Sequence, residues 1–241
     1  MKILIIADIH GYNEEISHYF KRVDVSGVDL IICPGDFTDM FNTETGFSQE
    51  NVAEMVLQKL LAYNKPLLCV PGNHDPYEIL DVFDDYGANL HNHTKRVGGI
   101  TFIGWGGAAT PFRTIFEPTE EETEEALKGL GKHVDNRTVV VLHNPPKGTK
   151  LDSVPEGKHV GSDAVRRFIE EKQPILVISA HIHEQQGTDK IGKTTLFYPG
   201  PFFDGNYGVV NINNTNVSCQ TVKIRSPPST DSADNPSPPR G

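Results

Sequence analysis

The residues best suited to chemistry in this sequence are histidines, aspartates and one asparagine that follow short apolar runs. Residues 66–70 form such a run and lead into Gly72-Asn73-His74-Asp75, which brings an amide, an imidazole and a carboxylate together. An amide oxygen is a neutral metal ligand, whereas an imidazole can bind a metal or transfer a proton. This mixture is typical of a hydrolytic metal centre rather than of a hydrophobic core.

Four further apolar runs end in similar groups. They contribute, in chain order, Asp8 with His10, Asp36, His143, and His181 with His183. In the spacings Asp-x-His and His-x-His, both side chains can point to the same side of an extended chain. Oxygen and imidazole ligands without thiolate favour Mn, Fe, Zn, Ni or Co. Because the candidates outnumber the ligands that one tetrahedral ion needs, we expect two divalent ions.

The elements that must position these groups alternate along the chain. The apolar, β-branched runs predict strands at residues 3–7, 29–33, 66–70, 138–142 and 174–179. Helical spacing predicts helices at residues 13–22, 49–62, 76–84, 119–131 and 162–172. This alternation indicates parallel strands joined by crossover helices. In such sheets, sites form outside the carboxyl ends of the strands, so we ask whether the five strand ends converge.

The rest of the chain is richer in strand patterns. Hairpins are predicted around Gly98-Gly99 and around Asn213-Asn214, a turn within residues 189–193, and a strand at residues 194–198. Residues 226–241 are rich in Ser, Pro and Asp, which predicts a disordered tail. The 241 residues therefore suggest one domain, residues 1–225, followed by that tail.

Composition narrows the class of partner. The formal net charge of −10 disfavours bulk binding to nucleic acid or to an anionic membrane, but a metal could still recruit a small anionic substrate. No apolar stretch approaches the length of a membrane span. The three cysteines have no disulfide-framework spacing and the N-terminus lacks a signal pattern, so we expect a cytoplasmic protein. The oligomeric state is open, a homo-oligomer included.

The set of motifs resembles the calcineurin-like metallophosphoesterase superfamily. Its pattern of Asp-x-His, Gly-Asp, Gly-Asn-His-Asp/Glu, His and Gly-His-x-His is matched in order by residues 8–183, with Ala180 in place of the last glycine. Residues 35–39 and 143–146 resemble the small prokaryotic phosphoesterases related to cyclic-nucleotide phosphodiesterases. The resemblance implies an α/β fold, namely a four-layer αββα sandwich of two mixed sheets flanked by helices.

The resemblance also implies a role for each matching residue. A first metal would be held by Asp8, His10 and His183, a second by Asn73, His143 and His181, and Asp36 would bridge the two. Manganese is the favoured metal. His74 would face the scissile ester as general acid, oriented by Asp39 or by Asp75. Asp75 could instead cap the helix that follows it.

The implied reaction is hydrolysis of a small phosphodiester, which could be nucleotide-like, by a metal-bridging hydroxide with His74 as general acid. A phosphomonoesterase or a nuclease would use the same metal core, and a non-catalytic interaction scaffold is the alternative from another class. Met40 follows Asp39 where the related protein phosphatases have arginine, which disfavours a phosphoprotein substrate.

Residues that contact the substrate are harder to predict. Arg113, after a glycine-rich loop, could grip a phosphate or be a solvated loop arginine, and Asn144 follows His143 directly. Trp105 could stack on a base or pack under the loop. The pair His91-x-His93 lies between elements, and we expect it not to bind metal.

Overall fold

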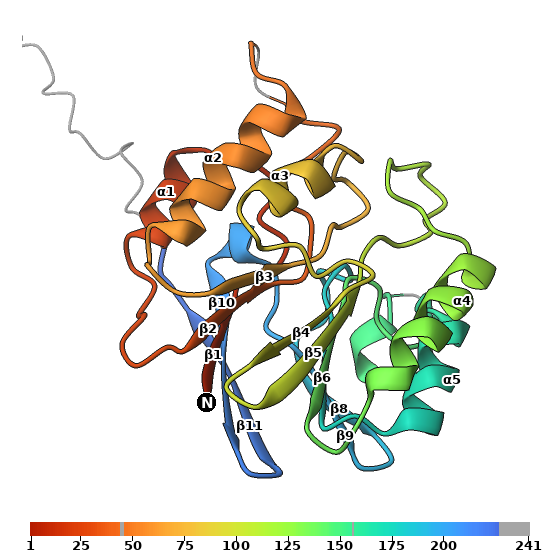
Figure 1. Ribbon diagram of the computed structural model, residues 1–241. Coiled ribbons are helices and arrows are strands. Elements are labelled where there is room, and N and C mark those ends of the chain that lie inside the picture. Colours follow the sequence, from red (N-terminus) through yellow and green to blue (C-terminus); the bar gives the residue numbers. More distant parts are fainter. Residues whose placement is uncertain (44–45, 156, 227–241) are drawn as a thin grey trace, which may run out of the picture.

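Two mixed β-sheets pack face to face in the computed structural model, which describes residues 1–43, 46–155 and 157–226 (Figure 1). The first sheet has the strand order β11-β10-β1-β2-β3, with β10 antiparallel to β1 and the next two pairs parallel. Its strands are β1 (Lys2–Ile5), β2 (Leu30–Cys33), β3 (Leu67–Cys69), β10 (Asn206–Asn213) and β11 (Asn216–Lys223).

The second sheet has the order β4-β5-β6-β7-β9-β8, parallel from β5 to β9 with an antiparallel strand at each edge. Its strands are β4 (Thr94–Val97), β5 (Ile100–Trp105), β6 (Thr138–Leu142), β7 (Leu176–Ile178), β8 (Gly187–Ile191) and β9 (Thr194–Tyr198). Both sheets are therefore mixed, as predicted.

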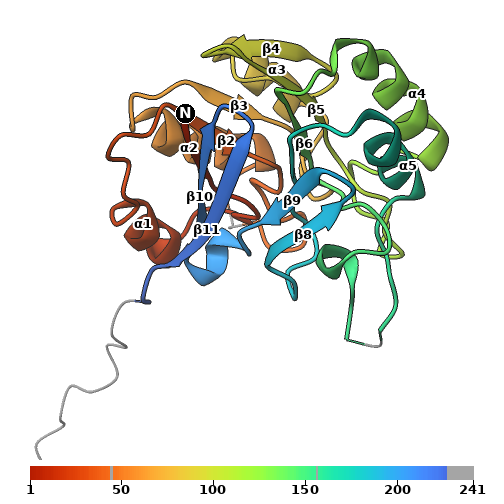
Figure 2. The same ribbon diagram turned by 90° about the horizontal axis from the view of Figure 1, so that it is seen from below.

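Helices cover the outer face of each sheet (Figures 1 and 2). The helices are α1 (Glu14–Phe20), α2 (Gln49–Leu61), α3 (Ile79–Asp85), α4 (Glu120–Leu130) and α5 (Asp163–Lys172). The first three pack on the first sheet and the last two on the second, which completes the predicted αββα sandwich.

The alternation of side chains along the strands explains the layers. In β1, Ile3 and Ile5 point into the core between the sheets, whereas Leu4 points to the helices. Both positions are apolar because both faces of the strand are covered, which is why the sequence shows a continuous apolar run. In β6, Val139 and Val141 likewise face the first sheet, and Val140 faces α4 and α5.

Most elements begin or end within a few residues of the predicted boundaries, and two differences are of another kind. Residues 187–191, of which the sequence pattern predicts part as a turn, form edge strand β8, and the turn comes at residues 192–193. Ser226, assigned to the tail, contacts the hydroxyl of Tyr19 at 2.9 Å. The remainder of the predicted tail lies outside the described residues. Within the described part of the chain, no helix is long and apolar enough to cross a membrane.

Candidate metal centre

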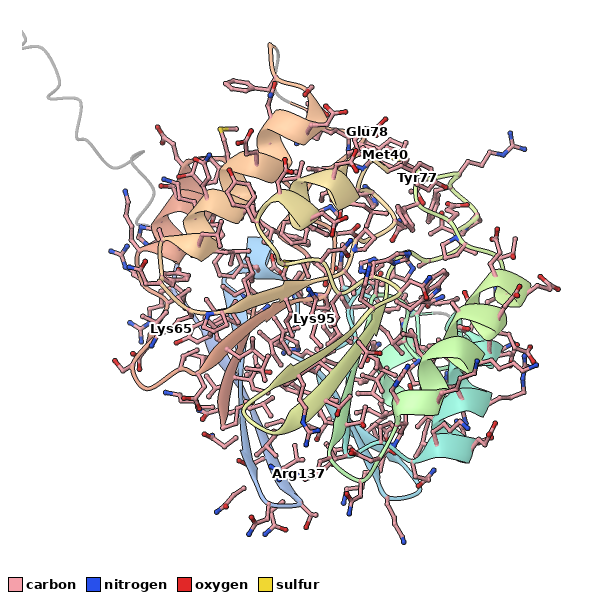
Figure 3. The ribbon with its side chains drawn as sticks, viewed as in Figure 1. Met40, Lys65, Tyr77, Glu78, Lys95 and Arg137 are labelled. Atoms are coloured by element: carbon pink, nitrogen blue, oxygen red, sulfur yellow. The ribbon has the colours of Figure 1, made fainter. Side chains whose placement is uncertain are left out.

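The carboxyl ends of five parallel strands meet where the edges of the two sheets adjoin. Arg137 lies immediately before β6, so it marks where that strand begins, and Met40 lies in the loop after β2, beyond where that strand ends. The two residues lie at opposite ends of the molecule, so β2 and β6 both run toward the end that holds Met40 (Figure 3). The polar groups that follow β1, β2, β3, β6 and β7 therefore face a common region. These groups are Asp8, His10, Asp36, Asn73, His74, His143, His181 and His183.

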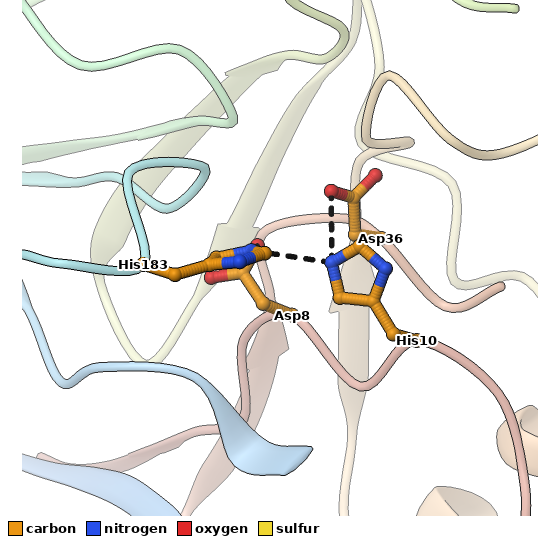
Figure 4. Close-up of side chains that lie close together, drawn as sticks. All are labelled: Asp8, His10, Asp36 and His183. Atoms are coloured by element: carbon orange, nitrogen blue, oxygen red, sulfur yellow. Dashed lines mark hydrogen bonds and ion pairs between the residues drawn. The ribbon is translucent and has the colours of Figure 1, made fainter. Parts of the chain in front are cut away.

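One cluster joins four of them. Single ligand atoms of Asp8, His10, Asp36 and His183 all lie within 4.8 Å of one another (Figure 4). Nε2 of His10 is 3.2 Å from Nε2 of His183 and 3.3 Å from Oδ2 of Asp36. Nε2 of His183 is 3.7 Å from Oδ1 of Asp8. The cluster thus brings together the three residues to which the resemblance assigns the first metal, with Asp36 beside them.

A second cluster lies on the other side of the same carboxylate. It consists of Asp36, His143 and His181. Nε2 of His143 is 3.3 Å from Oδ2 of Asp36 and 2.9 Å from Oδ1 of Asn73. Oδ2 of Asp36 is thus equally distant from one imidazole of each cluster, which is the position that a bridging ligand needs.

The donor atoms of the second cluster fit a cation. His143 donates Nδ1–H to the carbonyl of Pro34 at 2.9 Å, which leaves the Nε2 lone pair of the neutral ring facing the oxygens of Asn73 and Asp36. Three acceptor atoms that face one another need a positive charge between them, either a second proton on His143 or a metal ion. Imidazole, amide and carboxylate donors suit a divalent transition metal, so the residues fit the implied ions.

The protonation equilibria reflect the same convergence of charge. Burial by itself lowers the pKa of His143, but the Asp36 carboxylate raises it to about 9. Burial by itself raises the pKa of Asp36, yet His143 and His10 hold it well below its usual range. Burial lowers the pKa of His181 to about 3, which keeps that ring neutral and able to bind a metal.

The chain adopts strained conformations to build this centre. Asp8, His10, Asp36 and His181 have φ angles of 50°, 52°, 54° and 79°, in the left-handed region that non-glycine residues rarely adopt. Each costs on the order of 1–2 kcal/mol. Strain of this kind is concentrated at functional sites, because the surrounding contacts must hold it in place.

Gly72 is required for a different reason. A Cβ atom at this position would lie 2.0 Å from Oδ1 of Asp36, so the carboxylate occupies the space that any side chain would fill. The same oxygen accepts the main-chain N–H of His74 at 2.9 Å. Asp36 and the Gly72–His74 turn therefore fix each other.

His74 lies beside the clusters and has its own carboxylate partner. Its Nδ1 is 3.2 Å from Oδ1 of Asp39, and its ring meets that of His10 edge-on with centroids 4.8 Å apart. The exposed ring of Phe41 also meets the His74 ring edge-on, with centroids 5.4 Å apart. Burial lowers the pKa of His74, while Asp36 and Asp39 oppose that shift. A further group of potential ligand atoms, one from each residue, lies within 4.8 Å: it consists of His10, Asp39 and His74.

Asp75 makes contacts that serve the structure of the loops rather than the candidate metal site. It is fully buried, and its carboxylate accepts the main-chain N–H groups of Gly72, Thr38 and Phe37 at 2.8, 2.9 and 3.3 Å. Among the described residues, the carboxylate that contacts the His74 ring is that of Asp39, not Asp75. Helix α3 begins only at Ile79 and has no side-chain cap. Both sequence interpretations of Asp75 are therefore wrong: it ties two loops together.

The two residues predicted to contact the substrate belong to neither of the two candidate metal clusters. Arg113 is exposed, with a φ angle of 57°, and no hydrogen bond or ion pair of the described residues joins it to the centre. Asn144 faces a small cavity beside Trp105, where its Oδ1 has no partner among the described residues. Trp105 packs under the loop, as one interpretation held: it stacks on His91 and donates to Thr123.

Two residues that the sequence analysis did not select contact candidate ligands directly, and a third acts through one of them. Tyr198, at the end of β9, donates its hydroxyl to Asp8. Thr114 accepts a hydrogen bond from Asn73, and Glu117 accepts from Thr114. The local sequence offers one indication that Thr114 and Glu117 contact each other. Their spacing, Thr-x-x-Glu, is that of a helix capping box, although no helix begins at Thr114.

Comparisons with known proteins found a matching family, related sequences and similar structures. Residues 1–185 match the family described as calcineurin-like phosphoesterase. The uncharacterized protein MJ1162 of Methanocaldococcus jannaschii is 37% identical over 208 residues, which are 83% of this chain and 88% of that protein. The UPF0046 protein K07C11.7 of Caenorhabditis elegans is 26% identical over 86% of this chain and 71% of its own length.

Solved structures share the fold. The protein TT1561 of Thermus thermophilus superposes with a TM-score of 0.69, covering 93% of this chain and 99% of its own. Its sequence identity is 19%, so the similarity concerns the fold.

Proposed function

The chain belongs to the calcineurin-like phosphoesterase family, and from this premise we propose that it hydrolyses a small phosphodiester at a dinuclear metal centre. The observation that carries the proposal is the shared carboxylate: Oδ2 of Asp36 lies 3.3 Å from Nε2 of His10 and 3.3 Å from Nε2 of His143. One acidic oxygen between two imidazole-rich clusters is the arrangement that a pair of ions requires.

The proposed ligands divide between the two clusters. Asp8, His10 and His183 hold one ion and Asn73, His143 and His181 the other, with Asp36 common to both. When bound, the ions supply an acidified water and offset the negative charge that develops on the phosphoryl group. Manganese is the ion that we favour, and the donor atoms also suit Fe, Zn, Ni and Co.

His74 is the proposed general acid. Hydrolysis breaks the bond between phosphorus and the leaving oxygen, and that oxygen needs a proton. Asp39 lies against Nδ1 of His74 at 3.2 Å, so the proton on Nδ1 is held and Nε2 carries the one that is transferred. The side chain is 18% exposed, so the ring is held yet open to a substrate.

The surroundings favour a diester over a monoester. A pocket beside the centre is lined by His10, Tyr12, Asn13, Asp39, Asn42 and Gln49, among others, and none of the described residues that line it is Lys or Arg. A phosphomonoester dianion needs more positive charge than a diester monoanion. Met40, in place of an arginine, supplies none. Two metal ions are sufficient for the single charge of a diester.

The test is hydrolysis of bis-p-nitrophenyl phosphate and of p-nitrophenyl phosphate by metal-free protein supplied with Mn, Fe, Zn, Ni or Co. We expect turnover that depends on added metal, is highest with Mn, and favours the diester. Faster turnover of the monoester would overturn the diester proposal. No turnover with any of these ions would instead indicate an interaction scaffold.

A further inference from the structure

We propose that Thr114 and Glu117 are positioning residues that determine which end of the Asn73 side-chain amide faces the metal centre. The inference rests on the proposed function, because it takes Asn73 as a metal ligand. It concerns a hydrogen-bond relay in the loop of residues 106–117, which we call the strap.

The strap is attached to the main chain that carries Asn73. The carbonyl of Asn73 accepts the N–H groups of Ile115 and Phe116, both at 3.0 Å, and the carbonyl of Pro71 accepts that of Gly107 at 2.9 Å. The approach is close, because a Cβ atom on Gly106 would lie 2.3 Å from the Pro71 carbonyl oxygen. The strap thus has a fixed position relative to the candidate ligand.

The side chain of Asn73 is held at both ends. Its Nδ2 donates to Oγ1 of Thr114 at 3.1 Å, and its Oδ1 lies 2.9 Å from Nε2 of His143. An amide has one donor end and one acceptor end of nearly the same shape, so packing alone does not select between the two orientations. The hydrogen-bonding character of Thr114 distinguishes them from the strap side.

Glu117 sets that character. Its Oε1 accepts from the main-chain N–H of Thr114 at 2.6 Å and from the hydroxyls of Thr114 and Thr110 at 2.5 and 2.7 Å. A carboxylate only accepts, so the single hydroxyl proton of Thr114 must point toward Glu117. The lone pairs of that hydroxyl are then left for Asn73, and they can bond only to the N–H end of its amide.

The consequence reaches the metal centre. With Nδ2 committed to Thr114, the amide oxygen faces His143 and the second cluster, where it can serve as a neutral ligand. In the reversed orientation, an oxygen would meet the Thr114 oxygen with no proton between them, and an N–H group would face the ion. Residues that orient metal ligands typically change metal affinity 10–100-fold when they are replaced.

The experiment measures manganese binding to metal-free protein by isothermal titration calorimetry, with total bound metal counted by mass spectrometry. For Thr114→Val we expect one of the two binding events to weaken about 10–100-fold while the other stays unchanged. Thr114→Ser keeps the hydroxyl and should restore that event. Unchanged binding of both ions by folded Thr114→Val would overturn the inference.

A matched control separates positioning from general loss of a buried hydroxyl. Thr123 also accepts an N–H group, that of Trp105 at 3.2 Å, but has no bond to a candidate ligand. Thr123→Val should therefore bind both ions as the wild type does. Equal weakening in Thr123→Val and Thr114→Val would contradict a specific role for Thr114.

Variants at Glu117 test the relay without changing Thr114, and they serve also if Thr114→Val does not fold. Glu117→Leu removes the acceptor and should weaken the same binding event, whereas Glu117→Gln keeps an acceptor oxygen and should largely restore it. Two tight ions in Glu117→Leu would contradict the relay while leaving the proposed function intact. A wild type that binds none of Mn, Fe, Zn, Ni and Co would contradict the proposed function itself.

Discussion

The hydroxyl of Tyr198 donates a hydrogen bond to Oδ2 of Asp8, with 2.5 Å between the two oxygens. Both residues are fully buried, and they come from different sheets, since Tyr198 ends β9 and Asp8 follows β1. Oδ1 of Asp8 accepts the main-chain N–H of His181 at 3.2 Å. The bond therefore joins the two sheets at the centre and fixes the orientation of a candidate ligand.

Removing this hydroxyl should affect both stability and metal binding. Tyr198→Phe leaves a buried carboxylate oxygen without its donor, which costs about 1–3 kcal/mol. We expect a loss of that size in urea denaturation of the metal-free protein, and a manganese affinity about 10–100-fold weaker at one site. Wild-type values in both measurements would contradict the positioning role of Tyr198.

His74→Ala separates proton transfer from metal binding. Because His74 lies beside the clusters with Asp39 as its partner, the variant should bind two ions and lose about 10²–10⁴-fold in turnover. The loss should be larger for an alkyl leaving group, which needs a proton, than for p-nitrophenolate. Steady-state kinetics on both kinds of diester provide the measurement, and equal losses on the two would rule out His74 as general acid.

Asp39 and Asp75 should respond differently to the same substitution. Asp39→Asn should lower turnover while the free energy of unfolding changes by only about 0.5 kcal/mol, because the side chain is 23% exposed and an amide oxygen can still accept the N–H of Phe41. The Asp75 carboxylate accepts three main-chain N–H groups, and in Asp75→Asn an amide NH₂ replaces one of its two acceptor oxygens. This variant should therefore lose about 1–3 kcal/mol in free energy of unfolding. Thermal denaturation and kinetics on both variants distinguish the roles, and the opposite pattern would reverse the assignment.

His91, which lies outside the two candidate metal clusters, should make the stability of the protein depend on pH. Its Nδ1 accepts the N–H of Gly106 at 2.9 Å and its ring stacks on Trp105 at 4.4 Å, so the folded state holds it neutral. Burial, and to a smaller degree His93, lowers its pKa to about 4. In the unfolded chain the value is about 6.5, so below that pH the unfolded state binds a proton that the folded state excludes.

The stability from a neutral His91 is therefore complete above pH 6.5 and is lost as the pH falls toward 4. The difference between the pKa of His91 in the unfolded and the folded state corresponds to about 3 kcal/mol of unfolding free energy. His91→Gln keeps an acceptor but does not titrate, so its free energy of unfolding should fall less over this pH range. Denaturant titrations of both metal-free proteins from pH 4 to 7 make the comparison, and parallel curves would contradict the assignment.

The clustering of the candidate ligands could be predicted from the sequence because each follows a buried strand within a few residues. Residues 3–7, 30–33 and 139–142, which precede Asp8, Asp36 and His143, are apolar at every position, since both faces of each strand are covered. Parallel strands bring their carboxyl ends to one edge, so residues far apart in the chain were expected to meet. The parallel strands that this pattern predicted are confirmed, and so is the αββα sandwich that the family resemblance implied.

The rest depends on contacts that no local pattern encodes. Tyr198 looks like an apolar residue of a strand, and only the packing of β9 beside β7 brings it to Asp8. The motifs offer both Asp39 and Asp75 as partners of His74, and only the tertiary contacts show that Asp39 reaches the ring. Edge strand β8 was partly missed because its outward residues are polar and resemble a turn.

The central claim is that Asp36 joins two metal sites, and the most direct test counts metal ions. Wild-type protein and Asp36→Asn would be reconstituted with manganese, freed of excess metal, and analysed by mass spectrometry for ions per chain. The Asp36 carboxylate lies 3.3 Å from an imidazole of each cluster, so the account predicts two ions in the wild type and loss of both in Asp36→Asn. Two ions retained by Asp36→Asn, or none bound by the wild type, would contradict it.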